Sequence, residues 1–336
     1  MDWFETLTGF REDGYEPTRA KLKIEGTELL SLVNGRRCAI GSLELPSLAE
    51  LRARVGGDRG PGGRVKVRNA SGDIRAFHLF REHEGALFQV ASQFNMLEMV
   101  GPSVTPEHGV TRYEHDRTQG PACAISAGAA TLYRNYFAPV GDQVGQTKDR
   151  QLDGLVDLGP ALVQLTHKRL SSLWSMRNGY ALVTPDGLAA LTKALDGADE
   201  GERDRLRGLL RIGLHQDIEV TEPHAWGQTV SQAFCSAMPV AYGEGRWEDW
   251  RAIATLVLEA AYEATLWAAV LNARRGASNI VLLTRLGGGA FGNDDQWIDG
   301  AMQRALDLVA GYDLEVLLVS HGAPPASMLA LAARYG

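Results

Sequence analysis

The segment after residue 286 combines residue types that can bind an anion with residue types that can assist hydrolysis. Its glycines are Gly287, Gly288, Gly289 and Gly292. A backbone without Cβ atoms can approach a ligand closely, and its successive N–H groups can converge on an anion. The helix expected to begin near Asp294 adds partial positive charge at its N-terminus. The segment therefore predicts a diphosphate cradle, unless it is a tight strand-to-helix connection that Asp294 caps.

Common nucleotide and hydrolase motifs are absent from the chain. No G-x-x-x-x-G-K-[ST] occurs, and the glycine segment lacks the G-x-G-x-x-G spacing and the downstream acid of a dinucleotide fingerprint. No G-x-S-x-G occurs either, so the sequence does not indicate a serine hydrolase triad. A diphosphate bound here would be held by a loop of another kind.

Apolar strands and helices alternate on both sides of this segment. Strands are predicted at 229–240, 278–286 and 314–322, with helices at 246–276 and 294–310 between them. This alternation predicts an α/β layered domain, in which ligands collect outside the carboxyl ends of the strands. The glycine segment follows such a strand, so we expect it at the binding edge of the sheet.

The first two thirds of the chain contain shorter elements. Strands are predicted at 20–26, 36–45, 63–69, 74–80 and 86–94. Helices are predicted at 47–55, 119–137, 158–174, 184–195 and 199–211. The GGDRGPGG stretch at 56–63 is typical of a flexible connection. The loop that follows residue 94 spans about 25 residues, a length that favours a binding role.

The order of elements from residue 231 onward resembles the C-terminal half of a macrodomain. In that family, a strand and a helix with a central Tyr precede a strand that ends in a G-x-G-x-[FY]-G loop. Here the helix carries EAAYEATLWAAV, and the glycine segment matches the loop in order. The resemblance implies that the loop wraps the diphosphate and distal ribose of ADP-ribose, with Phe291 over the ribose unless it is a core aromatic. The residues implied are Gly287, Gly288, Gly289, Ala290, Phe291, Gly292 and Asn293.

The first half of the chain contains a divergent version of the family's other binding segment. Where macrodomains have a strand ending in Ala-Asn and then a Gly-Val phosphate loop, this chain has VASQFN and Gly109-Val110. The resemblance implies that Asn95 binds the distal ribose and that Gly109 and Val110 bind phosphate. In the related poly(ADP-ribose) glycohydrolases the same strand contacts adenine. This implies Gln89 or Gln93 for that contact, unless these are ordinary strand-end amides.

The helix expected from residue 119 departs from the poly(ADP-ribose) glycohydrolase pattern. Those enzymes have Gln-Glu-Glu at a comparable place, whereas this chain has Gln119-Gly120-Pro121. The resemblance keeps Gln119 as a candidate ligand-binding residue. The two glutamates of that mechanism are missing, so the mechanism does not transfer to this chain.

Other carboxylates would then have to assist glycosidic cleavage, which passes through an oxocarbenium-like state. Asp294 and Asp295 follow the glycine loop and are the first candidates, although Asp294 could instead cap the helix. Glu98 is the second candidate. The chain is also similar to bacterial macrodomain hydrolases that use aspartates to remove ADP-ribose from ubiquitin arginine. The charged residues expected to face solvent are Glu114, His115 and Asp116.

Composition and charge restrict the expected partners. The formal net charge is -7 and the pI is near 5.7, values that disfavour broad attraction to nucleic acid or anionic membranes. The N-terminus, MDWFETLTGFREDGY, is unlike a secretory signal, and the apolar stretch at 225–242 is too polar to span a bilayer. We expect a cytoplasmic protein whose partner is ADP-ribose or an ADP-ribosylated protein, with no nucleic-acid or membrane partner.

Cysteine and acid spacing predict neither disulfides nor a cofactor. Cys38, Cys123 and Cys235 are odd in number and far apart, which favours buried thiols over a disulfide framework or a zinc site. No spacing predicts another metal, although a Mg²⁺ site built from carboxylates and waters leaves little trace in a sequence. We therefore expect ADP-ribose as a ligand and no cofactor.

Together these features predict a three-layer, macrodomain-like α/β fold with a mixed sheet flanked by helices. The expected division is a β-rich extension at 1–84 and an ADP-ribose domain at 85–336, with a helical insertion at about 141–222. The expected function is binding of ADP-ribose and removal of mono-ADP-ribose from proteins by hydrolysis. Two alternatives stay open: a non-catalytic ADP-ribose reader, and an α/β scaffold whose glycine segment is only structural.

Overall fold

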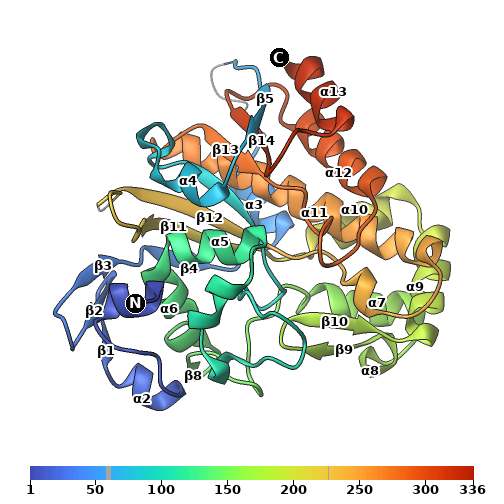
Figure 1. Cartoon of the computed structure of the whole chain (residues 1–336). Helices are drawn as coiled ribbons and strands as arrows, with labels where there is room; N and C mark the ends of the chain where they lie inside the picture. The colour runs from blue at the N-terminus through green and yellow to red at the C-terminus, as the bar shows by residue number, and fades with distance from the viewer. Residues whose placement is uncertain (58–61, 226) are drawn as a thin grey trace.

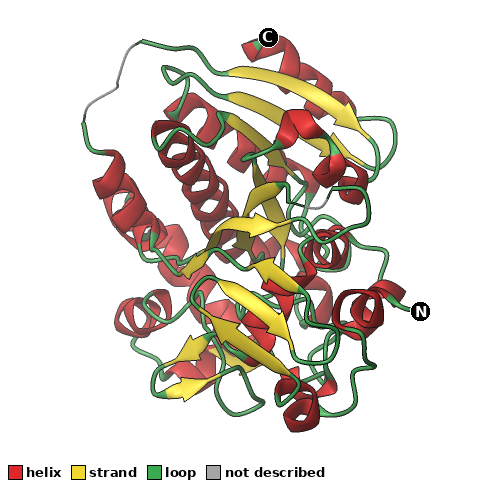
Figure 2. Cartoon of the chain, turned by 90° about the vertical axis from the view of Figure 1, so that its left-hand side faces the viewer, coloured by secondary structure: helices red, strands yellow, loops and turns green. Residues whose placement is uncertain are grey.

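A mixed seven-stranded sheet forms the centre of the molecule (Figure 1), in a computed structural model that describes residues 1–57, 62–225 and 227–336. The strand order is β4-β11-β12-β6-β13-β14-β5. The bounds are β4 Ser42–Glu44, β5 Lys66–Ser71, β6 Leu87–Ala91, β11 Gly213–Glu219, β12 Thr229–Cys235, β13 Ile280–Leu283 and β14 Glu315–Ser320. From β12 to β5 neighbouring strands are parallel, whereas β11 pairs antiparallel with both β12 and β4. Helices lie on both sides of the sheet (Figure 2), which confirms the predicted fold class.

Alternate residues of the central strands belong to two different cores, because successive side chains of a strand point to opposite faces. In β6, Leu87 belongs to one buried cluster and Phe88 to another. In β14, Val316 and Leu318 share the cluster of Leu87, while Leu317 packs with Phe88. Burial on both faces explains why these strands are almost continuously apolar.

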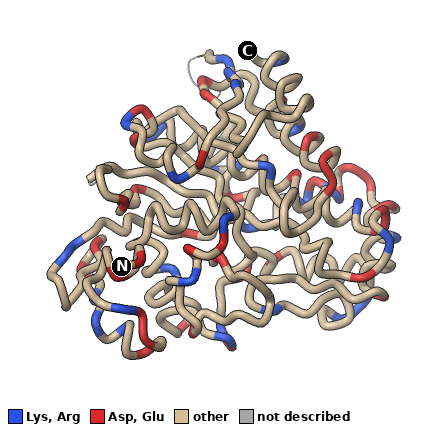
Figure 3. The backbone as a smooth tube through the Cα atoms, in the orientation of Figure 1, with Lys and Arg blue, Asp and Glu red and all other residues tan. Residues whose placement is uncertain are grey.

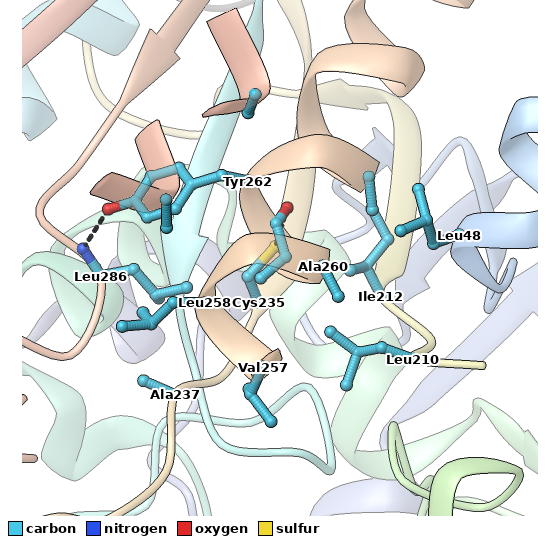
Figure 4. Close-up of a cluster of buried hydrophobic side chains, with 14 of the residues drawn as sticks. Leu48, Leu210, Ile212, Cys235, Ala237, Val257, Leu258, Ala260, Tyr262 and Leu286 are labelled. Atoms are coloured by element: carbon cyan, nitrogen blue, oxygen red, sulfur yellow. Dashed lines mark hydrogen bonds between the residues drawn. The ribbon is translucent and has the colours of Figure 1, made fainter. Parts of the chain in front are cut away.

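The face that carries Leu87 is covered by helices around α11 (Trp247–Arg274), and Figure 4 shows part of this core. The other helices of this cluster are α3 (Leu48–Val55), α7 (Leu158–Thr166), α8 (Leu170–Leu173), α9 (Pro185–Gly197), α10 (Glu200–Gly208), α12 (Asp295–Leu308) and α13 (Ala326–Tyr335). Among the described residues, α11 alone is long and apolar enough to cross a membrane. Its most apolar window is 83% buried within the fold, which is the pattern of a core helix.

The opposite face is covered by α4 (Ile74–Leu79), α5 (Gln119–Ser126) and α6 (Gly128–Tyr136). The strand predicted at 74–80 is wrong, because Asp73 accepts a hydrogen bond from the N–H of Arg75 and caps α4. A single helix predicted at 119–137 is likewise wrong. The chain turns at Ala127, where φ is -117° and ψ is 59°.

The N-terminal part and the insertion both contribute strands to the main sheet. Residues 1–39 form a small antiparallel unit that packs on α6, with bounds α1 Trp3–Thr8, α2 Tyr15–Arg19, β1 Leu22–Glu25, β2 Glu28–Ser31 and β3 Arg37–Ala39. The insertion includes β8 Gln143–Val144, α8 Leu170–Leu173, β9 Trp174–Arg177 and β10 Tyr180–Val183, and β7 Pro139–Val140 directly precedes it. However, the N-terminal part also supplies β4 and β5, which are the two edge strands of the main sheet. The insertion supplies β11, which lies inside the same sheet between β4 and β12. The predicted boundaries at 84 and 222 therefore cut across one shared sheet.

Charges of both signs are interspersed along the chain (Figure 3). All three cysteines are buried and free, as predicted. Burial raises the pKa of the Cys38 thiol to about 11 and that of Cys235 to about 12. Residues 58–61 of the connection predicted at 56–63 lie outside the described residues.

Candidate functional site

A cleft made of two adjoining cavities follows the carboxyl ends of the parallel strands. The first cavity has a volume of about 190 Å³ and lies beyond β6 and β13. The second has a volume of about 630 Å³ and extends beyond β14 and β5. Both are lined by Asp116, Thr118, Gln119, Thr284 and Arg285. The cleft is therefore at the edge where open α/β sheets bind ligands.

Tyr262 of α11 fixes the start of the glycine loop, residues 287–293. Its hydroxyl donates to the carbonyl oxygen of Thr284 at 2.6 Å and accepts from the N–H of Leu286 at 2.8 Å, as Figure 4 shows for the second bond. Burial raises the pKa of this phenol, so its proton stays available to donate. The central helix thus sets where the loop leaves the sheet.

The glycine loop leaves three N–H groups unused. Within the described residues, the N–H groups of Gly289, Ala290 and Phe291 donate to no other group, whereas that of Gly292 bonds the carbonyl of Gly289 at 3.0 Å. Gly287 has φ +74°, and a Cβ there would lie 2.5 Å from the Cβ of Ala237. The loop therefore has the free donors that an anion cradle requires, while Gly287 allows the start of the loop to pack closely on Ala237.

The predicted loop residues divide into two groups. Gly287, Gly289, Ala290 and Phe291 line the first cavity. Gly288, Gly292 and Asn293 do not line it. Asn293 is buried and donates to the carbonyls of Met238 at 2.8 Å and Gly287 at 3.3 Å, so its amide closes the loop from within. The prediction that Asn293 contacts a ligand therefore has no support in this placement.

Three aromatic rings form one wall of the first cavity. The rings of Phe291 and Tyr180 are 5.3 Å apart, and those of Phe291 and Tyr242 are 5.8 Å apart. The Tyr180 hydroxyl also donates to the carbonyl of Met99 at 2.7 Å, joining β10 to the loop after β6. Sequence analysis missed both tyrosines, because Tyr180 lies in the insertion and no local pattern marks either residue.

Glu98 presents a buried carboxyl group to this cavity. Its side chain is only 2% exposed, and Oε1 has no hydrogen-bond partner. Burial raises the pKa of Glu98 well above its ordinary value, the buried guanidinium of Arg134 opposes this shift, and the charge of Asp116 adds to it. A buried oxygen without a partner costs free energy unless a ligand or water bonds it. Glu98 is thus the predicted catalytic residue with the best placement.

Gly120 makes room for the Glu98 carboxyl. A Cβ at this position would overlap Oε2 of Glu98 and the carbonyl oxygen of Ala91. The adjacent Gln119 fixes β6, because its side chain accepts from the N–H of Ala91 at 2.9 Å and donates to the carbonyl of Gln89 at 2.7 Å. Gln119 and Gly120 therefore shape one side of the cavity, while the carboxyl group in it belongs to Glu98 of the loop after β6.

Asp294 and Asp295, the first predicted catalytic residues, do not line the cleft. Asp294 caps α12 by accepting from the N–H of Gln296 at 2.8 Å. The side chain of Asp295 is 77% exposed and pairs with Arg285 at 2.6 Å. The helix-cap alternative therefore describes Asp294, and Asp295 orients an arginine of the cleft wall.

The predicted amides on the β6 side have mostly structural partners. Asn95 is fully buried, donates to the side chain of Gln151 at 2.9 Å and accepts from the N–H of Leu97 at 3.1 Å. Gln89 donates to Thr265 at 3.0 Å inside the core. Neither residue lines the cleft, whereas Gln93 does and also accepts from the N–H of Met99 at 2.6 Å. Asn95 and Gln89 are thus placed as structural amides.

The Gly109-Val110 turn binds a carboxylate of the chain itself. The side chain of Glu12 accepts from the N–H groups of Val110 at 2.9 Å and Thr111 at 2.7 Å, and from the hydroxyl of Tyr136 at 2.6 Å. A Cβ at Gly109 would overlap this carboxylate. The predicted phosphate loop is therefore an anion-binding turn, but Glu12 occupies it outside the cleft.

No group of three or more His, Cys, Asp or Glu within the described ranges could hold a metal ion. Comparison with protein-family models gives no match, and comparison with curated proteins gives none either.

Comparison with solved structures finds bacterial poly(ADP-ribose) glycohydrolases. The enzyme from Thermomonospora curvata is 14% identical, with 96% of each chain covered and a TM-score of 0.44. The same enzyme bound to the inhibitor ADP-HPD is 14% identical, with 95% of each chain covered and a TM-score of 0.43. The enzyme from Deinococcus radiodurans in complex with ADP-ribose is 12% identical and has a TM-score of 0.42. The match covers 88% of this chain and 93% of that chain. At such low similarity, what this chain binds follows only from its own residues.

Proposed function

We propose that this protein binds ADP-ribose and hydrolyses ADP-ribosyl adducts on proteins, releasing mono-ADP-ribose. The observation that carries this proposal is the Glu98 carboxyl, which is buried, has an oxygen without a partner and faces the same cavity as the glycine loop. An acid beside an anion cradle suits cleavage of a bond next to a diphosphate-linked sugar.

The cleft suits a ligand with an anionic middle and two uncharged ends. The free N–H groups of Gly289, Ala290 and Phe291 would bind the diphosphate. The small cavity, walled by aromatic rings, would take the distal ribose beside Glu98. The larger cavity, lined by Asp73 and His321, would take the adenosine half. The predicted adenine contact is Gln89 or Gln93, and neither lines the larger cavity, so this arrangement places adenine away from both residues.

Calorimetry with ADP-ribose and with AMP tests the binding part. We expect ADP-ribose to bind more tightly than AMP, because only ADP-ribose reaches both cavities and the full cradle. Absence of heat with both ligands would favour the scaffold alternative and end the proposal.

Release of ADP-ribose from proteins modified at arginine, serine or glutamate tests the catalytic part. We expect wild-type turnover on at least one linkage, and a loss of about 100-fold or more in Glu98→Gln. Asp294→Asn should keep turnover close to wild type, since its side chain caps a helix. ADP-ribose binding without release from any of the three linkages would favour the reader alternative.

A further inference from the structure

We infer that Asp116 is a second catalytic carboxylate, which activates water while Glu98 protonates the leaving atom. This inference rests on the proposed function and assigns a role to a residue that the sequence predicts to face solvent. Asp116 instead lines both cavities of the cleft, at their junction.

Local structure holds Asp116 at that junction. It follows the 3-10 helix Thr111–His115 and precedes α5, and its Oδ1 accepts from the N–H of Thr118 at 2.9 Å. One carboxylate oxygen is thus bonded within the turn. In the described part of the chain, no hydrogen bond or ion pair engages Oδ2, which leaves an acceptor for water in the cleft.

The two carboxyl groups face one cavity but differ in surroundings. Glu98 is buried against Gly120 and Tyr113, whereas Asp116 is partly exposed where the larger cavity opens. Their charges interact, since Asp116 disfavours ionisation of Glu98. Pairs of carboxyls whose surroundings favour different protonation states divide acid and base roles in glycosidic hydrolysis.

The step balances with water as the only co-reactant. Glu98 gives its proton to the nitrogen or oxygen of the modified side chain as the bond from that atom to C1 of the distal ribose breaks. Asp116 takes a proton from a water molecule as the water oxygen forms the new bond to C1. The products are ADP-ribose and the unmodified side chain. Proton exchange with solvent restores both carboxyl groups, and nothing is oxidised or reduced.

Several other polar groups interact electrostatically with Glu98 from the elements packed around it. They are Arg134 on α6, Cys123 on α5, Tyr113 on the 3-10 helix and Tyr180 on β10. Arg134 is buried and bonds the carbonyl of Met96 at 3.1 Å, so it supports the turn before Glu98 without lining the cavity. Asp116 is therefore the other carboxylate placed to act on water in this cavity.

A pair of substrates separates the two roles. One is an ADP-ribosylated protein, whose leaving atom needs a proton; the other is the 4-nitrophenyl adduct of ADP-ribose, whose phenolate leaves without one. We expect Glu98→Gln to lower kcat about 100-fold on the first substrate and less than about tenfold on the second. Asp116→Asn should lower kcat about 100-fold or more on both, with the Kd for ADP-ribose within about threefold of wild type. The matched control is Asp149→Asn, because Asp149 is exposed and does not line the cleft. This variant should change neither kcat nor the Kd for ADP-ribose.

The outcomes distinguish this inference from the proposed function. If the wild-type protein hydrolyses the substrates and Asp116→Asn has the same kcat, the role of Asp116 is overturned and the proposed function stays intact. A tenfold or larger loss of ADP-ribose affinity with unchanged kcat would make Asp116 a binding residue and would also overturn it. A wild-type protein that hydrolyses neither substrate would overturn both proposals.

Discussion

At the scale of single residues, the feature that defines the site is a carboxyl group kept out of water. Glu98 lacks a partner for Oε1, and its neighbour Gly120 has no side chain to displace it. Such an arrangement lowers stability and persists where function requires it. Replacing either residue should therefore change both stability and activity.

Glu98→Gln should flatten the dependence of stability on pH. Burial raises the pKa of Glu98, so the stability that its proton contributes is complete below the ordinary value of 4.5 and is lost as pH rises through the raised pKa. Arg134 opposes this rise, while Asp116 adds to it. The Tm of the wild type should fall relative to that of Glu98→Gln as pH rises from 4.5 through the raised pKa. Parallel Tm profiles for the two proteins would contradict this prediction.

Gly120→Ala should damage the site through crowding alone. The added Cβ would overlap the carboxyl of Glu98 and the carbonyl of Ala91, so we expect a cost of about 1–3 kcal/mol and a lowered kcat. Gly300→Ala on α12 is the control, because a Cβ there meets nothing within 4 Å. Denaturant unfolding and turnover measure both effects. Wild-type stability and kcat in Gly120→Ala would show that the space beside Glu98 is not needed.

The sequence predicts part of the residue-scale picture. The glycine spacing places a cradle after a strand, and Glu98 is named as a candidate. It cannot show that Asp294 caps a helix while Asp116 faces the cleft, because both are acids in polar runs and only tertiary packing separates them. It also cannot show that Glu12, almost 100 positions away, occupies the Gly109-Val110 turn.

At the scale of elements, the loop depends on the helix behind it. Tyr262→Phe removes the hydroxyl that joins the carbonyl of Thr284 to the N–H of Leu286. Leaving that N–H unpaired in the core should cost about 1–3 kcal/mol and weaken ADP-ribose binding. Tyr312→Phe, which removes a hydroxyl of a partly buried tyrosine, is the control. Calorimetry and thermal unfolding give the two readouts, and wild-type affinity in Tyr262→Phe would contradict the role given to this helix.

Long periodic elements are predicted well and short ones poorly. The helix at 246–276 is long enough to show helical periodicity, and the strands around 280 and 315 are marked by short, nearly continuous apolar runs. The segment 74–80 is too short to separate strand from helix by alternation, and the Asp73 cap decides it. Strand β11 and the hairpin β9–β10 are missed because tertiary pairing, rather than local pattern, forms them.

At the scale of the whole molecule, one sheet joins segments that the sequence separates. Because β4, β5 and β11 belong to the central sheet, the N-terminal part and the insertion should unfold together with the site. ADP-ribose at 100 times its Kd should therefore stabilise the whole chain by about 2.7 kcal/mol in a single transition. Two separate transitions, with only one shifted by ligand, would show independent units.

A crystal structure of Glu98→Gln soaked with ADP-ribose tests the central claim most directly. We predict the diphosphate at the N–H groups of Gly289, Ala290 and Phe291, and the distal ribose within hydrogen-bond distance of residue 98. ADP-ribose bound away from the glycine loop, or bound with its distal ribose turned from residue 98, would contradict the account.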